Sequence, residues 1–251
     1  KTITLPAAPG TAELYGKAVT ALLPGIGKPP RVPADATAPE TRYRLDGVRV
    51  DSTALQAYCH ATGQRFGGTL PLTYPFVLQF PVVMKLMTSD EFPFGAVGSV
   101  HMTNTIERSR PIEVGEPLDI VTHAQNLREH RKGILIDVVS EIRVGSELVT
   151  TQTATFLKQQ RTSLSDEPRG PEPKSKTPPP PDAILAVDLK RIREYAAASG
   201  DRNPIHMGNL PAKAFGFPKA IAHGMWSAAA AVANVEAQLP DAVTYDVRFG
   251  K

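Results

Sequence analysis

Hydrophobic and polar residues alternate from Tyr43 to Val50, a pattern typical of a strand that buries one face. Asp51 follows as a helix N-cap, and the amphipathic segment that it begins ends before Gly63. A second helix is predicted from Tyr74 to Thr88, where apolar residues recur at helical spacing. Pro81 restricts where this helix can start, because proline has no N–H for the preceding turn. We expect the second helix to be central and buried.

Four further segments with strand character follow the second helix. A long helix packed on a curved antiparallel sheet accounts for this order, so the sequence predicts an α+β fold. The four segments are separated by turn-forming residues and cover Ser99–Ile106, Leu118–Asn126, Gly133–Val144 and Glu147–Leu157.

Proline marks the boundaries of the predicted domains. Residues 161–182 form a proline-rich linker, in which Pro178–Pro181 favours the extended polyproline II conformation. The linker separates an N-terminal half, residues 41–160, from a C-terminal half, residues 183–251. Residues 1–40 form a leader rich in proline and alanine.

The C-terminal half repeats the beginning of the N-terminal half. Ile184–Val187 is predicted to be a strand, Asp188 begins a helix, and Gly200 ends it. Repetition of such a unit indicates a duplicated fold. The residues that match at one constant offset are Val50 with Val187, Asp51 with Asp188, Tyr58 with Tyr195 and Gly63 with Gly200.

The repeat is incomplete at its C-terminal end. After its predicted long helix the second half has one strand-like segment, Val243–Lys251, where the first half has four. The counterpart of residues 111–157 is absent. We therefore expect a C-terminal sheet that lacks strands in this chain.

Composition narrows the class of protein. Hydrophobic residues make up 41% and charged residues 21%, which is typical of a globular chain. The longest apolar stretch is far shorter than the ~20 residues of a membrane-spanning helix, and Lys1–Leu23 lacks the pattern of a secretion signal. We expect no membrane span and a cytoplasmic location.

Cys59 is the only cysteine, which excludes an internal disulfide and a zinc site built on thiolates. The net charge of +3 is too small to indicate nucleic-acid binding but is compatible with an anionic ligand such as a CoA phosphate.

Two motifs in the C-terminal half carry the candidate chemistry. Gly200–His206 reads GDRNPIH, and Ala220–Met225, further along the chain, reads AIAHGM. Together they resemble the MaoC-like (R)-specific enoyl-CoA hydratases, and the two-half layout resembles actinobacterial (3R)-hydroxyacyl-thioester dehydratases. The resemblance implies a double hotdog, in which each half wraps a curved antiparallel sheet around a long central helix. It also implies reversible hydration of trans-2-enoyl thioesters in fatty-acid metabolism, with CoA or acyl carrier protein as the carrier.

The first motif suits the addition of water to a double bond. Hydration places a hydroxyl at C3 and a proton at C2, so a water must be held between a proton acceptor and a proton donor. Pro204 stiffens the loop by fixing its φ near about −65°, which can direct a carboxylate and an imidazole at one water. The resemblance implies that Asp201 acts as the base and that His206 assists proton transfer. Asn203 would orient the loop or bind polar groups of the substrate.

The second motif supplies a candidate oxyanion donor. Gly224 is expected to begin a helix, whose first N–H groups are free and carry partial positive charge. Such a donor stabilises the negative charge that develops on a thioester carbonyl, and glycine permits close approach. His223 is equally compatible with orienting the loop and with filling the turn. This chemistry needs neither a metal nor a redox cofactor.

The N-terminal half lacks the same groups. Pro81 aligns with Gly224 and has no N–H to donate. We expect a degenerate, non-catalytic hotdog that provides an apolar channel for the acyl tail. The candidate residues to line this channel are Phe76, Leu78, Phe80 and Met84, although packing in the core is the commoner role for such residues. The positions of Asp201, Asn203 and His206 are occupied there by Gln64, Phe66 and Thr69.

Other functions are left open by the sequence. An aspartate that caps a helix and a satisfied histidine are common without catalysis. One alternative is a hotdog acyl-thioesterase, which would activate water to attack the carbonyl rather than C3. Another is a non-catalytic subunit that binds the acyl chain and catalyses neither hydration nor hydrolysis. Acyl chain length, carrier and direction of reaction are also open, and the layout is compatible with a homodimer of double-hotdog chains. Four histidines lack ligand-like clustering, so a structural or solvated role is expected for His60, His101, His123 and His130.

Overall fold

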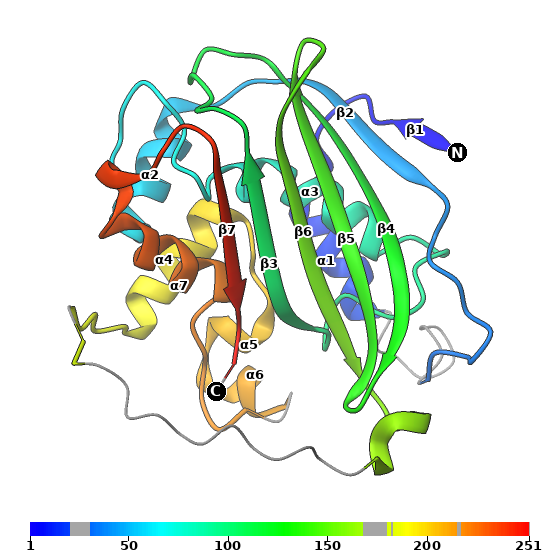
Figure 1. Cartoon of the computed structure of the whole chain (residues 1–251). Helices are drawn as coiled ribbons and strands as arrows, with labels where there is room; N and C mark the ends of the chain where they lie inside the picture. The colour runs from blue at the N-terminus through cyan, green and yellow to red at the C-terminus, as the bar shows by residue number, and fades with distance from the viewer. Residues whose placement is uncertain (21–30, 168–179, 182, 215–216, 251) are drawn as a thin grey trace.

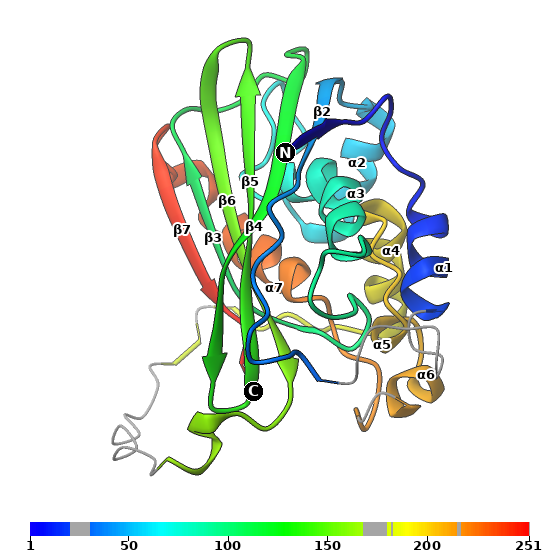
Figure 2. The ribbon, with the colours of Figure 1, turned by 90° about the vertical axis from the view of Figure 1, so that its right-hand side faces the viewer.

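The computed structural model describes residues 1–20, 31–167, 180–181, 183–214 and 217–250. Most of the proline-rich linker predicted at residues 161–182 lies outside the described residues. Figure 1 shows a curved sheet in front of the helices, and Figure 2 shows that the helices cover one face of that sheet. The predicted α+β class, with helices packed on a curved sheet, is confirmed.

The described strands form one seven-stranded sheet in the order β1-β2-β4-β5-β6-β3-β7. Neighbouring strands are antiparallel, except that β1 and β2 are parallel. The predicted strands of the N-terminal half are all present, and most extend a few residues further than predicted. Their bounds are β1 Thr2–Thr4, β2 Arg42–Val48, β3 Val100–Arg108, β4 Leu118–His130, β5 Gly133–Val144, β6 Glu147–Gln159 and β7 Val243–Arg248.

Helix α3, Pro75–Met87, is the central helix of the N-terminal half. It packs against β2, β4 and β5, and it fully buries Val82 and Leu86. Each such side chain contributes about 1.5–3 kcal/mol when it leaves water. Pro81 lies inside α3 and not at its start, so the expected restriction on the helix start was wrong. Pro81 is therefore not the helix-terminal counterpart of Gly224.

The remaining helices lie on the same side of the sheet as α3 (Figure 2). They are α1 Thr11–Thr20, α2 Ser52–Thr62, α4 Leu189–Ser199, α5 Pro204–Met207, α6 Asn209–Ala214 and α7 Gly224–Ala233. Two short 3-10 helices are also described, η1 Ser163–Asp166 and η2 Glu236–Gln238. Among the described residues, none of the helices is both long and apolar enough to cross a bilayer.

Helices α2 and α4 share the same caps, as the repeat predicts. Asp51 accepts a hydrogen bond from the N–H of Ala54, and Asp188 accepts one from the N–H of Arg191. Both helices end in a glycine with left-handed backbone, at φ 78° for Gly63 and 75° for Gly200. The two helices pack against each other. The internal repeat is thus visible in local structure.

The C-terminal half joins the N-terminal half through strand and helix contacts. β7 pairs with β3, where the Thr105 hydroxyl donates to the Asp246 carboxylate at 2.6 Å. The Trp226 indole N–H, on α7, donates to the carbonyl of Ala61 on α2 at 2.8 Å. β7 is the one strand that the described part of the C-terminal half adds to the sheet.

The predicted strand Ile184–Val187 does not form. These residues have no regular structure, and the side chain of Ile184 is 86% exposed. An apolar run becomes a strand only where a neighbouring strand can pair with it, and none lies beside this segment in the described sheet. The repeat therefore begins at the helix cap and not at a strand.

Candidate active site

The loop between α4 and α5 carries the carboxylate of the first motif, and α5 carries its imidazole. The side-chain oxygen of Asn203 caps α5 by accepting from the Ile205 N–H at 3.4 Å. Pro204 occupies the first turn, where its missing N–H costs nothing. The one-turn helix then presents His206, whose ring lies close to Asp201 and His223. One polar side-chain atom from each of these three residues lies within 4.8 Å of the others.

Asp201 is held at both its side chain and its backbone. The Tyr15 hydroxyl donates to Oδ1 at 2.5 Å, and the Asn203 N–H donates to the same oxygen at 3.2 Å. The backbone carbonyl of Asp201 accepts a hydrogen bond from Nε2 of His223 at 2.9 Å. Tyr15 belongs to α1. A segment predicted to be only a leader therefore contributes to the site.

Backbone carbonyls fix the tautomers of the two histidines. Nδ1 of His206 lies 2.8 Å from the carbonyl oxygen of Ile221, and because a carbonyl only accepts, this nitrogen carries the hydrogen. Nε2 of neutral His206 is then an acceptor. In the same way, His223 donates from Nε2, which leaves its buried Nδ1 without a partner among the described residues. The two rings stack with centroids 3.8 Å apart.

The electrostatic environment keeps Asp201 charged and His223 neutral. Burial alone would raise the pKa of the Asp201 carboxyl, but the two imidazoles and the hydrogen bonds described above outweigh burial, and the pKa lies below its ordinary value. Burial lowers the pKa of His223 to about 4, against the opposing effect of the Asp201 charge. Near neutral pH the site therefore holds a carboxylate beside an uncharged His223.

Gly224 is the first residue of α7, as the second motif predicts, and His223 is its N-cap. First-turn N–H groups have no partner within the helix, so this end offers donors to a ligand. A Cβ at Gly224 would lie 2.8 Å from the ring of Phe249. Only glycine fits this contact without movement of the ring.

An aromatic cluster around His101, on β3, lies beside the site. The His101 ring stacks on Phe156 at a centroid distance of 4.8 Å, and it meets Phe249 at the same distance and Phe76 at 6.2 Å. Burial lowers the pKa of His101 to about 4, and the charge of Asp201 is near enough to act in the opposite direction. His101 is thus an uncharged part of an aromatic wall.

The neutral state of His101 predicts a loss of stability in acid. His101 binds a proton with a pKa near 6.5 in the unfolded chain and about 4 in the folded chain. Its contribution to the free energy of unfolding is therefore fully present above pH 6.5 and is lost as the pH decreases towards 4. Replacing His101 by Phe is expected to remove about 1–3 kcal/mol of this decline, because Phe fits the aromatic cluster without charging. Urea unfolding at pH 7.5 and 4.5 measures the difference. An equal decline in both proteins would contradict the assignment.

The residues of the N-terminal half that align with the first motif form a different arrangement. Gln64 is buried, and its side-chain oxygen accepts from the Thr73 hydroxyl at 2.7 Å. The Thr73 hydroxyl accepts in turn from Tyr58 at 2.8 Å. Phe66 is 49% exposed. This hydrogen-bond chain has no carboxylate and no imidazole.

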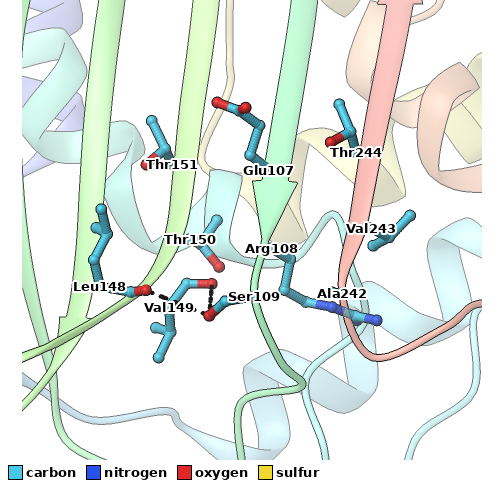
Figure 3. Close-up of a pocket in the computed structure, with 10 residues that line it drawn as sticks. All are labelled: Glu107, Arg108, Ser109, Leu148, Val149, Thr150, Thr151, Ala242, Val243 and Thr244. Carbon is cyan, nitrogen blue, oxygen red and sulfur yellow. Dashed lines mark hydrogen bonds between the residues drawn. The ribbon is translucent and has the colours of Figure 1, made fainter.

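A hollow of about 440 Å³ opens elsewhere on the molecule. Figure 3 shows its side chains in front of the ends of β3, β6 and β7, with the helices behind the sheet. It includes no residue of either motif, so it is not the candidate site. Its lining residues are Glu107, Arg108, Ser109, Leu148, Val149, Thr150, Thr151, Ala242, Val243 and Thr244.

The cluster of Asp201, His206 and His223 is compact enough to hold a cation in principle. The hydrogen bonds to Oδ1 of Asp201 and from one nitrogen of each imidazole leave one polar atom free on each residue, so they do not decide for or against a cation. We assign no metal to the cluster.

Three residues near the site were missed from the sequence. Tyr15, His101 and Phe249 come from α1, β3 and the segment after β7, and they meet the motif residues only through the tertiary fold. Tyr15 lies 186 positions from Asp201. None of the three belongs to a local motif that could have identified it.

A long helix on a curved antiparallel sheet, with a loop carboxylate and imidazole beside a helix N-terminus, defines a hotdog protein with a dehydratase-type site. Residues 171–251 match the MaoC-like domain family. The chain is 48% identical over 225 residues to 3-hydroxyacyl-thioester dehydratase X of Mycobacterium tuberculosis, covering 90% of this chain and 80% of that relative. The chain therefore belongs to the MaoC-like dehydratase family.

Solved structures agree with this assignment. A crystal structure of HtdX from Mycobacterium tuberculosis superimposes with a TM-score of 0.74 at 45% identity and covers 84% of this chain and 82% of its own. A MaoC-like dehydratase from Phytophthora capsici, at 19% identity, gives a TM-score of 0.66 over 88% of this chain and 83% of its own, and supports the fold alone. The hotdog architecture implied by the motifs is confirmed.

Proposed function

We propose that this protein catalyses the reversible hydration of trans-2-enoyl thioesters to (3R)-hydroxyacyl thioesters in fatty-acid metabolism, and acts as a dehydratase in the reverse direction. The observation that carries the proposal is the pairing of a charged Asp201 with a His206 whose Nε2 is available as an acceptor. The dehydratase name of the mycobacterial relative supports the same reaction class.

Asp201 and His206 act together on one water in this proposal. The water bonds to C3 through its oxygen while Asp201 accepts one of its protons, and Nε2 of His206 accepts a hydrogen bond that orients it. The electron pair of the double bond moves through C2 onto the thioester oxygen. The proton then returns to C2, with assistance from His206, and restores the carbonyl. The net reaction is the addition of one water across the C2–C3 double bond, with no leaving group.

Gly224 stabilises the intermediate charge in the same scheme. Its N–H begins α7, where the partial positive charge of the helix end faces the approaching carbonyl oxygen. Asn203 holds the loop by capping α5, and His223 braces it through the Asp201 carbonyl. The last two residues therefore act by orienting the catalytic pair.

The organisation of the whole chain forms part of the proposal. Residues 183–251 act as the catalytic hotdog, and residues 41–160 act as a non-catalytic hotdog that lends apolar surface to the acyl tail, since Gln64 replaces the carboxylate there. The substrate carrier is CoA or acyl carrier protein. We further propose a cytoplasmic location, in keeping with a single buried cysteine that has no disulfide partner. We also propose that two chains form a homodimer.

A stopped assay with crotonyl-CoA distinguishes this function from that of a thioesterase. We expect loss of the enoyl absorbance with no release of free thiol, because the water activated by Asp201 attacks C3 and not the carbonyl. Thiol release without hydration would indicate the thioesterase. Binding without either reaction would indicate an acyl-binding subunit.

A further inference from the structure

Helix α1 is fixed against the active-site loop. Leu14 and Ala18 are each only 2% exposed and anchor the helix in the core, and α1 packs against α3. The Thr11 methyl group lies 3.4 Å from the position that a Cβ on Gly200 would occupy. Figure 2 shows α1 at the outer side of the helical layer, away from the sheet. The helix therefore lies against the active-site loop, on the side of the helical layer away from the sheet.

This anchoring places Tyr15 on one oxygen of the Asp201 carboxylate. Oδ1 accepts from the Tyr15 hydroxyl at 2.5 Å and from the Asn203 N–H at 3.2 Å, whereas Oδ2 has no hydrogen-bond partner among the described residues. Burial and the charge of Asp201 raise the pKa of the Tyr15 phenol, so it keeps its proton and acts as a donor. One oxygen is held and the other is left for a ligand.

We propose that Tyr15 is a positioning residue for Asp201, which holds Oδ1 so that Oδ2 faces the reacting water. This role rests on the proposed function, because it assigns Oδ2 to proton transfer. A carboxylate that rotates freely would present the wrong oxygen or the wrong angle to the water for part of the time. Holding the carboxylate in one orientation avoids this loss of catalytic rate. The N-terminal segment thereby becomes part of the catalytic apparatus.

Replacing Tyr15 by Phe tests the role, because it removes one hydroxyl and keeps the ring. We expect kcat for crotonyl-CoA hydration to fall about 10-fold to 100-fold, the range for a hydrogen bond to a charged group, with KM within about twofold. Tyr245→Phe is the matched control, since this half-buried tyrosine also donates one hydrogen bond, to the Ala228 carbonyl at 2.9 Å. The control is expected to keep its kcat.

The pH dependence separates positioning from packing. A donor to a carboxylate favours the charged form, so loss of the Tyr15 hydroxyl raises the pKa of Asp201 and moves the acid limb of kcat to higher pH. Four other titratable groups face this carboxylate and are retained in the variant. They are His206 on α5, His223 before α7, His101 on β3 and Tyr195 on α4.

Carbon-13 NMR titration of the Asp201 carboxyl group gives a readout that does not require activity. A higher carboxyl pKa in Tyr15→Phe, together with the lowered kcat, supports the proposal. If the wild type hydrates crotonyl-CoA, the proposal is overturned by an unchanged kcat in Tyr15→Phe. An unchanged pKa of the Asp201 carboxyl group in Tyr15→Phe also overturns the proposal. A wild type that does not hydrate crotonyl-CoA refutes the proposed function and the catalytic role of Tyr15 together, while the titration still shows whether Tyr15 holds the carboxylate.

Discussion

Replacing Asp201 by Asn is expected to lower kcat for crotonyl-CoA hydration by about 10²–10⁴-fold, the usual contribution of a general base. Asparagine keeps the shape of the side chain but cannot accept the proton of water. Its amide is also a poorer acceptor for the hydrogen bond that Tyr15 donates to the carboxylate. KM should change far less than kcat, because the lost interaction belongs to the transition state.

His206→Gln is expected to produce a loss of similar size. Glutamine cannot relay a proton, and it cannot both donate to the Ile221 carbonyl and present an acceptor in the position of Nε2. His60→Gln is the matched control, since His60 is exposed on α2 and is expected to leave kcat unchanged. Full hydration activity in both Asp201→Asn and His206→Gln would show that the proposed mechanism is wrong.

The second large effect is expected at Gly224. A methyl group here would lie 2.8 Å from the Phe249 ring and beside the N–H that is proposed to stabilise the oxyanion. We expect Gly224→Ala to lower kcat about 10²-fold, the lower range for loss of one oxyanion donor, and to cost about 1–3 kcal/mol of stability through overpacking. Steady-state kinetics and urea unfolding measure the two effects separately.

Two further variants identify the cause of the Gly224 effect. Gly67→Ala is the control, because a Cβ at that exposed glycine meets nothing within 4 Å. In the double variant with Phe249→Ala the clash is absent, so stability should no longer suffer from overpacking, while kcat stays low. Recovery of full kcat in the double variant would mean that the ring contact, and not access to the Gly224 N–H, explains the loss.

Signals confined to a few neighbouring residues predicted the structure well. The caps Asp51 and Gly63 bound α2, and their repeats Asp188 and Gly200 bound α4, because a side-chain acceptor and a left-handed glycine are local requirements. The helix start at Gly224 was found for the same reason. Motif spacing likewise predicted that Asp201 and His206 lie close together, although His206 belongs to the short helix α5 and not to a loop.

Features that depend on tertiary contacts could not be found in this way. Ile184–Val187 reads as a strand but finds no neighbour in the described sheet. Pro81 is accommodated inside α3, although its pattern suggested a helix boundary. Tyr15 reaches Asp201 only because α1 packs over the loop, so a segment that reads as a leader supplies a hydrogen bond to the proposed base.

The measurement that tests the central claim most directly is the identity of the product formed from crotonyl-CoA in deuterium oxide. Water attack at C3 by one site built on Asp201 and His206 predicts (3R)-3-hydroxybutyryl-CoA with a single deuteron at C2 and an intact thioester. The (3S) product, or crotonate with free CoA, would contradict the account.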